Sequence, residues 1–322
     1  MLIAREMPQL LSVVIPMYNE EEAFPHLKAE LERILPTWGC PTELVLVDDG
    51  SRDATFSLMH AWSQADPSVK AIALSRNFGH QIAVTAGLDA ALGEAVVIMD
   101  ADLQDPPAIV SDMLRGYCLG YDVVYGQRTK RHDETLFKRF SAKCFYWLMR
   151  TFVDARLPDN VGDFRLITRR VVEDLRRMGE RDRFLRGMVS WVGYGQLAAP
   201  YARPGRVAGE TKYPFWKMLR FAITAITAFS DAPLRLVTWA GIGSMALSVV
   251  LIVRTVVLYF WGDQPLVLGW ASLTILLCLF SGLILVSLGL VGIYVGKIFV
   301  ESQRRPLYLV RHAQNVEGSP FR

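Results

Sequence analysis

Residues 94–107 read EAVVIMDADLQDPP, an apolar run that ends in three acidic residues and two prolines. A short run rich in valine and isoleucine is typical of a buried strand, and proline favours the first turn of a following helix. The other runs of this kind are LLSVVIP (10–16), ELVLVDD (43–49), VKAIALS (69–75) and YDVVYG (121–126), and helical stretches lie near residues 20–35, 53–65, 80–92 and 107–118. Because strands alternate with helices, the sequence predicts an α/β fold with a doubly wound, mostly parallel sheet.

Polar side chains follow three of the predicted strands. They are Tyr18-Asn19-Glu20, Asp48-Asp49, and Asp100 with Asp102. Ligands of open α/β sheets bind beyond the carboxyl ends of the strands, so we expect these residues to share one site. Tyr18 can stack on a base, and Glu20 can accept hydrogen bonds from ribose hydroxyls. We expect Asp48 or Asp49 to bind ligand and Asp53 mainly to cap the next helix.

Asp100 and Asp102 have the spacing of a cation site. Two carboxylates in the turn after a strand can hold Mg²⁺ together with substrate phosphate oxygens, and Gln104 can add a neutral oxygen. Surface turns often contain such a pair without binding anything. The preceding strand and the following prolines favour the cation site here.

Composition excludes several classes of protein. The chain has 322 residues, of which 52% are hydrophobic, and this is ample material for a core and excludes disorder. A net charge of +3 gives no reason to expect a nucleic acid partner. The four cysteines are scattered, as expected of reduced thiols. The glycine-rich signatures of dinucleotide-binding and P-loop enzymes are absent from the sequence.

Two long apolar stretches lie toward the C-terminal end. Residues 236–261 carry one charge, Arg254, and residues 266–296 carry none. Each is long enough to cross a hydrocarbon layer of about 30 Å as a helix. The alternative, a pair of buried core helices, is disfavoured because such helices usually have a polar face. Lysine and arginine flank the outer ends but not the connecting loop, so both chain ends are expected in the cytoplasm.

The chain therefore divides into a membrane part and a cytoplasmic part. The predicted parts are a cytoplasmic domain (1–210), a juxtamembrane amphipathic segment (211–235), two transmembrane helices (236–261 and 266–296) and a cytoplasmic tail (297–322). The amphipathic segment predicts an interfacial helix, with a helix packed on the globular domain as the alternative. The tail either adds a strand to a neighbouring subunit or folds back, and the sequence does not decide.

Six motifs in order resemble those of the inverting family-two glycosyltransferases of the GT-A fold. They are PMYNE (16–20), DDGSRDAT (48–55), RNFG (76–79), DADLQDPP (100–107), VGDFRLITR (161–169) and RVAGETKY (206–213). The chain is most similar to the polyprenyl-phosphate glycosyltransferases, especially the bactoprenol glucosyltransferases, from about residue 10 to the tail. The resemblance implies a Rossmann-like GT-A domain, bound Mg²⁺ or Mn²⁺, and a location in the bacterial inner membrane.

The resemblance also implies a role for each matching residue. The nucleotide-sugar would be held by Pro16, Tyr18, Asn19, Glu20, Asp48 and Asp49, and its diphosphate by Arg206 and Lys212. The metal would be bound by Asp100, Asp102 and Gln104, with Asp102 also counted as catalytic. Asp163 matches a carboxylate near the anomeric carbon, and it would act either as a base or as an orienting group. Arg128 and Arg139 match the residues that meet the acceptor phosphate, with a solvated helix face as the alternative for Arg139.

The resemblance leaves the substrates partly open. UDP-glucose is the expected donor and undecaprenyl phosphate the expected acceptor, and the reaction would proceed with inversion. Alternatives are UDP-formamidoaminoarabinose, GDP-mannose, a UDP-N-acetylhexosamine, another lipid acceptor, or a membrane-tethered nucleotide-sugar binder without turnover. The QxxRW motif of processive synthases is absent, and the nearest stretch, RGMVSW at 186–191, has different spacing. A homo-oligomer is a candidate assembly, and a lipid-linked sugar flippase is a candidate downstream partner.

Overall fold

The computed structural model describes residues 3–129, 161–202, 232–261 and 269–316. The chain forms two compact units. The first comprises residues 1–214 and 305–322, and the second residues 215–304. The tail that follows the apolar helices therefore belongs to the same unit as the N-terminal domain.

The first unit is built on a sheet of eight described strands in the order β7-β5-β6-β4-β1-β2-β3-β8. The strands are β1 (Leu11–Met17), β2 (Thr42–Asp48), β3 (Val69–Leu74), β4 (Ala95–Ile98), β5 (Val123–Arg128), β6 (Val161–Thr168), β7 (Gln196–Tyr201) and β8 (Val310–Gln314). Strands β6 and β8 run antiparallel to their neighbours, whereas the β1–β2, β1–β4, β2–β3 and β5–β7 pairs are parallel. The predicted α/β fold with a mostly parallel sheet is confirmed.

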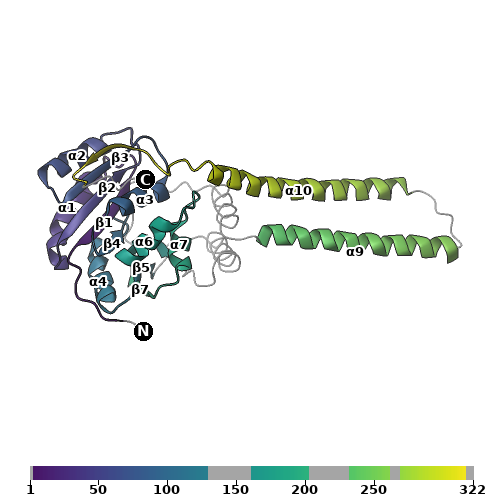
Figure 1. The fold of residues 1–322 in the computed structure, drawn as a ribbon, viewed down its shortest axis with the longest axis horizontal. Helices are drawn as coiled ribbons and strands as arrows, with labels where there is room; N and C mark the ends of the chain where they lie inside the picture. Colours follow the sequence, from purple (N-terminus) through teal and green to yellow (C-terminus); the bar gives the residue numbers. More distant parts are fainter. Residues whose placement is uncertain (1–2, 130–160, 203–231, 262–268, 317–322) are drawn as a thin grey trace. The chain divides into compact units, whose positions relative to one another are not determined.

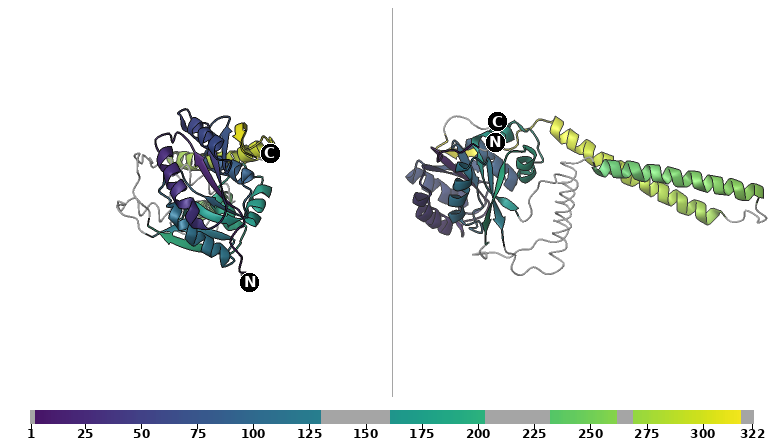
Figure 2. Two further views of the ribbon diagram at one scale, coloured as in Figure 1. Left: turned by 90° about the vertical axis from the view of Figure 1, so that its left-hand side faces the viewer. Right: turned by 90° about the horizontal axis from the view of Figure 1, so that it is seen from below.

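Helices cover both faces of the sheet, as a doubly wound fold requires (Figures 1 and 2). The described helices of this unit are α1 (Phe24–Ile34), η1 (Leu35–Trp38), α2 (Thr55–Ala65), α3 (His80–Ala90), η2 (Pro107–Ile109), α4 (Val110–Cys118), α6 (Arg169–Arg177) and α7 (Leu185–Trp191). They fall within or next to the four predicted helical stretches and in the region after β6. The strand expected at 121–126 is instead found at Val123–Arg128, two residues further along.

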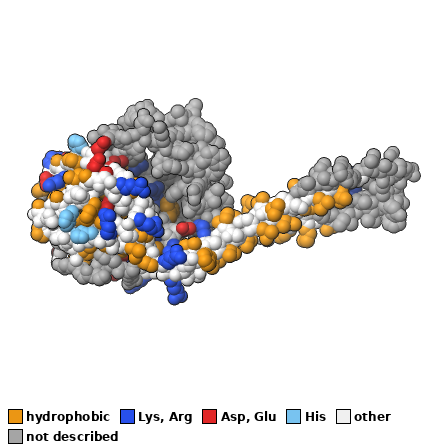
Figure 3. All heavy atoms as spheres, turned by 90° about the horizontal axis from the view of Figure 1, so that it is seen from above, with side chains coloured by type: hydrophobic (Ala, Val, Ile, Leu, Met, Phe, Trp, Pro, Cys, Tyr) orange, Lys and Arg blue, Asp and Glu red, His pale blue; other side chains and the backbone are white. Residues whose placement is uncertain are grey.

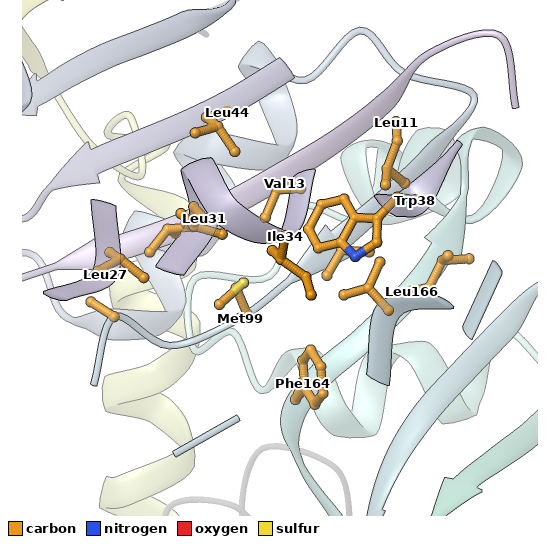
Figure 4. Packing of buried hydrophobic residues seen from close by; sticks show 14 of the residues in the cluster. Leu11, Val13, Leu27, Leu31, Ile34, Trp38, Leu44, Met99, Phe164 and Leu166 are labelled. Carbon is orange, nitrogen blue, oxygen red and sulfur yellow. The ribbon is translucent and has the colours of Figure 1, made fainter. Parts of the chain in front are cut away.

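The main core lies between the sheet and helices α1 and α4. Leu27 and Leu31 on α1 are fully buried. They belong to one cluster with Val13 of β1, with Met99, which follows β4, and with Phe164 of β6 (Figure 4). Alternate residues of β1 enter this cluster, and the intervening Val14 faces α3 on the other side. A strand buried on both faces needs a continuous apolar run, and the sequence of β1, LSVVIPM, provides one.

The second unit contains two long helices, α9 (Ala232–Trp261) and α10 (Trp270–Ser302). The residues of this unit expose large apolar side chains, including Trp239, Leu285 and Phe299 (Figure 3). Within the described residues, one segment, Leu279–Ser302, is long and apolar enough to cross a membrane. The second predicted span, 266–296, corresponds to a helix that continues past it to Ser302. The predicted interfacial helix lies outside the described residues.

Candidate active site

Strand β6 brings Asp163 to the end of β4. The two strands are antiparallel, and Ile98 pairs with Arg165. Asp100 follows Ile98 by two residues and Asp163 precedes Arg165 by two, so in this antiparallel pair both side chains arrive at the same edge of the sheet. His80, the first residue of α3, lies between them, with Nε2 at 3.7 Å from Asp100 Oδ1 and 3.5 Å from Asp163 Oδ2. These three side chains come from three elements that are far apart in the sequence.

Asp163 is held by donors on both of its carboxylate oxygens. Gln81 Nε2 donates a 2.9 Å hydrogen bond to Oδ2, and Arg186 donates from Nε and Nη2 to Oδ1 at 3.3 and 3.2 Å. Burial raises the pKa of Asp163, but the charge of Arg186, the hydrogen bond with His80 and the charge of Arg165 outweigh it and hold that pKa well below its usual range. Asp163 is thus a fixed, ionised carboxylate.

Gln81 and Arg186 are site residues that sequence reasoning missed. Gln81 also accepts a 3.1 Å hydrogen bond from the amide of Leu185, the first residue of α7. One side chain therefore joins the start of α7 to the carboxylate of Asp163. The sequence pointed to Arg186 only as the first residue of RGMVSW, the stretch nearest to the absent QxxRW motif.

Asp100 and Asp102 are both partly exposed, as a cation site at a strand end requires. Burial raises the pKa of Asp100 to about 6, and His80 offsets this only in part. Asp102 Oδ1 accepts a 3.1 Å hydrogen bond from the amide of Gln104, which closes the turn. Gln104 itself is buried. The described residues contain no group of three or more histidine, cysteine, aspartate or glutamate side chains that could hold a metal ion, so a cation bound by Asp100 and Asp102 would take most of its remaining ligands from substrate or water.

Asp48, the last residue of β2, and Asp49, which follows it, have different surroundings. Asp49 accepts hydrogen bonds from the amides of Phe78 and Gly79 at 2.7 and 2.9 Å, so both of its oxygens hold the turn before α3. Burial raises its pKa. Asp48 is fully buried, and its Oδ1 accepts a 2.9 Å hydrogen bond from the amide of Ser51. Its Oδ2 has no hydrogen bond partner in the described part of the chain. Of the two carboxylates, Asp48 is the one with an oxygen left for a ligand.

The loops after β1 and β2 are tied together. Asn19 has a positive φ of 54°; its Oδ1 accepts from the amide of Arg52 and its amide donates to Ser51 Oγ, both at 2.9 Å. Asp53 accepts from the amides of Thr55 and Glu21. The N-cap residue of α2 is Ala54, without a side-chain cap hydrogen bond, so the expected capping role of Asp53 is wrong, and its side chain instead ties the loop after β1 to the first residue of α2. These bonds present Tyr18, which is 42% exposed, on a platform built from two loops.

Further loop contacts fix the other nucleotide-side residues. The amide of Glu20 donates a 2.9 Å hydrogen bond to Thr55 Oγ1, and Pro16 lies within β1 opposite Val47 of β2. The main chain on both sides of Tyr18 is therefore anchored to β2 and its loop.

Arg128 ends β5 and is held by two buried side chains. Its Nε donates a 3.2 Å hydrogen bond to the hydroxyl oxygen of Tyr201, and its Nη2 lies 3.6 Å from Asp105 Oδ1. Burial lowers the pKa of Arg128, but the hydroxyl of Tyr201 and the charge of Asp105 raise it overall. Tyr201 and Asp105 are further residues that sequence reasoning did not assign. The predicted residues Arg139, Arg206 and Lys212 lie outside the described ranges.

Comparisons with known proteins show the family to which the chain belongs. Residues 12–176 match the family described as Glycosyl transferase family 2. The chain is 43% identical over 307 residues to the uncharacterized glycosyltransferase YkcC of Bacillus subtilis, with 95% of each chain covered. It is 36% identical over 306 residues to the bactoprenol glucosyl transferase of Shigella phage SfV, covering 94% of this chain and 98% of that one. A solved mannosyltransferase of Pyrobaculum calidifontis, in complex with GDP-Man and Mn²⁺, is 18% identical with a TM-score of 0.42, covering 88% of each chain.

Proposed function

Because the chain belongs to glycosyltransferase family 2, we propose that it transfers a sugar from a nucleotide-sugar, with UDP-glucose as first candidate, to polyprenyl phosphate in a bacterial plasma membrane. The observation that carries this proposal is the ionised Asp163 beside Asp100 at the carboxyl ends of the parallel strands. The names of the bactoprenol glucosyl transferase relatives support glucose and the lipid acceptor as the first substrates to test.

The proposed reaction is one in-line displacement with inversion. A phosphate oxygen of the lipid attacks the anomeric carbon, and the bond from that carbon to the nucleoside diphosphate breaks. A phosphate monoester is largely ionised near neutral pH, because its second pKa is about 6. The nucleophile therefore needs little help from a base.

Asp163 suits the role of a fixed negative charge rather than that of a base. Its pKa lies well below the usual range, and Gln81 and Arg186 donate to its oxygens. A preorganised carboxylate at this place would stabilise positive charge on the sugar ring in the transition state. We accordingly choose the orienting and electrostatic role over proton removal.

Asp100 and Asp102 fit a Mg²⁺ or Mn²⁺ site that the donor diphosphate completes. They are two partly exposed carboxylates after one strand, which is the small protein ligand set that Mg²⁺ uses with substrate phosphates. When bound, the cation would neutralise charge on the departing diphosphate. We propose Gln104 as a further ligand, Arg206 and Lys212 as diphosphate contacts, and Arg128 and Arg139 as contacts of the acceptor phosphate.

Chain connectivity supports a membrane hairpin. The chain leaves the first unit after residue 214 and returns to it at residue 305. A unit that lies on one side of a membrane requires an even number of crossings between these points. If α10 crosses the membrane, we therefore expect α9 to cross as well. This reasoning, with the flanking lysines and arginines, favours a cytoplasmic active site next to the lipid phosphate.

The proposal is tested by assaying a panel of nucleotide-sugars against undecaprenyl phosphate with the full-length protein in membranes. We expect UDP-glucose to be used, Asp102→Asn to lose activity at limiting Mg²⁺, and Asp163→Ala to lose turnover. Asp112→Asn is the matched control, because Asp112 is an exposed carboxylate on α4. Wild-type activity of Asp102→Asn at limiting Mg²⁺ would remove the metal assignment. Nucleotide binding without any lipid product would instead favour a binding protein.

A further inference from the structure

The chain beyond α10 folds back onto the sheet of its own first unit. Strand β8 pairs antiparallel with β3, the edge strand of the N-terminal part, with Ala71 opposite Gln314 and Ala73 opposite His312 (Figure 1). The amide of Ser75 also donates a 2.8 Å hydrogen bond to the carbonyl of Leu309. Of the two arrangements the sequence left open, the structure has the fold-back.

Side chains on both flanks of β8 fix it in place. Before the strand, Tyr308 is buried, and its hydroxyl donates a 2.7 Å hydrogen bond to Asp89 Oδ2. After the strand, Asn315 adopts a positive φ of 59°, and its Nδ2 donates a 2.9 Å hydrogen bond to the carbonyl of Val69. A strand anchored at both ends can hold a side chain at a defined position.

Arg311 is the irregular residue of this strand. Ala73 pairs with His312 and Leu74 pairs with Val310, so Arg311 has no opposite residue in the ladder. Such a bulge interrupts the regular alternation of side chains and turns one of them in a new direction. Bulges of this kind are frequent beside binding sites.

The bulge brings Arg311 to Asp48. Arg311 Nη2 lies 3.8 Å from Asp48 Oδ2, which is the buried oxygen without a hydrogen bond. The guanidinium also lies 5.6 Å from the ring centroid of Phe56 on α2, and its side chain is 53% exposed. A buried carboxylate oxygen without a donor is unfavourable, so it calls for a partner that supplies an N–H group.

We propose that Arg311 is a donor-site residue that, together with Asp48, recognises the base of the nucleotide-sugar. This rests on the proposed function, in which Asp48 contacts the nucleoside. Asp48 offers an acceptor and Arg311 adjacent donors, and this pair matches a base edge on which a ring N–H lies beside a carbonyl. Uracil and guanine have that edge. Cytosine presents an unprotonated ring nitrogen beside an amino group, and adenine likewise, so both would be disfavoured.

The consequence is that the segment after the apolar helices forms part of the nucleotide site. Domain boundaries drawn from hydropathy place residues 297–322 in a cytoplasmic tail, apart from the predicted site. Arg311 instead joins Tyr18, Glu20 and Asp48 as a candidate contact of the nucleoside.

The experiment measures the Kd of UDP for the purified full-length protein in detergent with Mg²⁺, together with the steady-state kinetics of transfer. We expect Arg311→Ala to weaken UDP binding by about tenfold or more, the usual cost of losing a charge-assisted hydrogen bond. The KM for the donor should rise while that for the lipid acceptor stays constant, and Arg311→Lys should recover part of the loss. The preference of the wild type for UDP over CDP should fall in Arg311→Ala.

Controls separate this inference from the proposed function. Arg115→Ala removes an exposed arginine on α4 and should leave UDP binding unchanged. If the wild type transfers sugar and Arg311→Ala binds UDP as tightly as the wild type, or more tightly, then the role of Arg311 is overturned and the proposed function stands. If the wild type binds no nucleoside diphosphate, both fail. The thermal unfolding midpoint of each variant shows whether it is folded.

Discussion

The hydroxyl of Tyr201 donates a 2.6 Å hydrogen bond to Asp105 Oδ1, and the same hydroxyl oxygen accepts from Arg128 Nε at 3.2 Å. Asp105 belongs to the DADLQD loop, and Arg128 ends a strand on the other side of β6. One phenol therefore joins the proposed metal loop to the arginine proposed to meet the acceptor phosphate. Burial, reinforced by Asp105, raises the pKa of Tyr201 to about 12, so the hydroxyl stays protonated and keeps donating.

Tyr201→Phe should free Arg128 from this arrangement. We expect kcat to fall and the KM for polyprenyl phosphate to rise, with a combined loss of roughly tenfold or more, because the hydroxyl's hydrogen bonds to two charged groups, Asp105 and Arg128, are removed. The KM for the nucleotide-sugar should change little. Tyr125→Phe removes a hydroxyl from neighbouring strand β5 and is the matched control. Equal losses in the two variants, or a loss confined to the donor KM, would contradict the positioning role of Tyr201.

Gly162→Ala tests the same arginine from the other side. A Cβ at this position would lie 2.7 Å from Arg128 Nη2, so the guanidinium would have to move. We expect reduced transfer with a nearly unchanged thermal unfolding midpoint, because the end of an arginine side chain moves easily. Gly179→Ala, whose Cβ would meet nothing within 4 Å, controls for the general cost of replacing a glycine. Full activity of Gly162→Ala would show that the exact place of Arg128 is unimportant.

The local pattern of apolar residues was sufficient to predict the parallel strands and the helices between them. Each apolar run became a strand within about two residues of its expected bounds, because burial on both faces requires a continuous run of such residues. The order of the strands was not predictable in this way. Nothing in VGDFRLIT indicates that β6 inserts antiparallel between β4 and β5, since pairing depends on contacts between distant segments.

The residues of the candidate site differ in the same way: some are predictable from a local motif, and others depend on contacts between distant segments. Asp100 and Asp102 could be proposed as cation ligands from sequence, because both carboxylates lie in one turn. Gln81, Arg186 and Tyr201 could not, because each acts through a side chain that is 23 or more residues away. The different roles of Asp48 and Asp49 could not be predicted from sequence either, since only their hydrogen bond partners distinguish the two carboxylates.

Arg186→Lys tests the geometry around Asp163. Lysine keeps the positive charge but cannot donate from two nitrogens in the planar arrangement that Arg186 uses. We expect kcat to fall by about 10- to 100-fold while the Kd of the nucleotide stays within about twofold, because the charge is kept and its orientation is lost. Arg177→Lys, an exposed change on α6, is the control. A change in nucleotide Kd without a change in kcat would place Arg186 at the donor instead.

Glu43→Gln should lower stability in a pH-dependent way. Glu43 is buried, and its carboxylate accepts from Lys70, Ser12 and the amide of Leu92. Burial raises its pKa, but these donors outweigh burial and lower it below the ordinary value, so this stabilisation is present at neutral pH and is lost as the pH falls through the lowered pKa. We expect the variant to lose roughly 3 kcal/mol at pH 7, since it leaves a buried ammonium without its counter-ion, and to approach the wild type under acid conditions. Thermal unfolding of the full-length protein in detergent across this pH range measures the difference, with exposed Glu32→Gln on α1 as control. A stability gap that is constant with pH would mean that the lost free energy comes from packing rather than from the charge of Glu43.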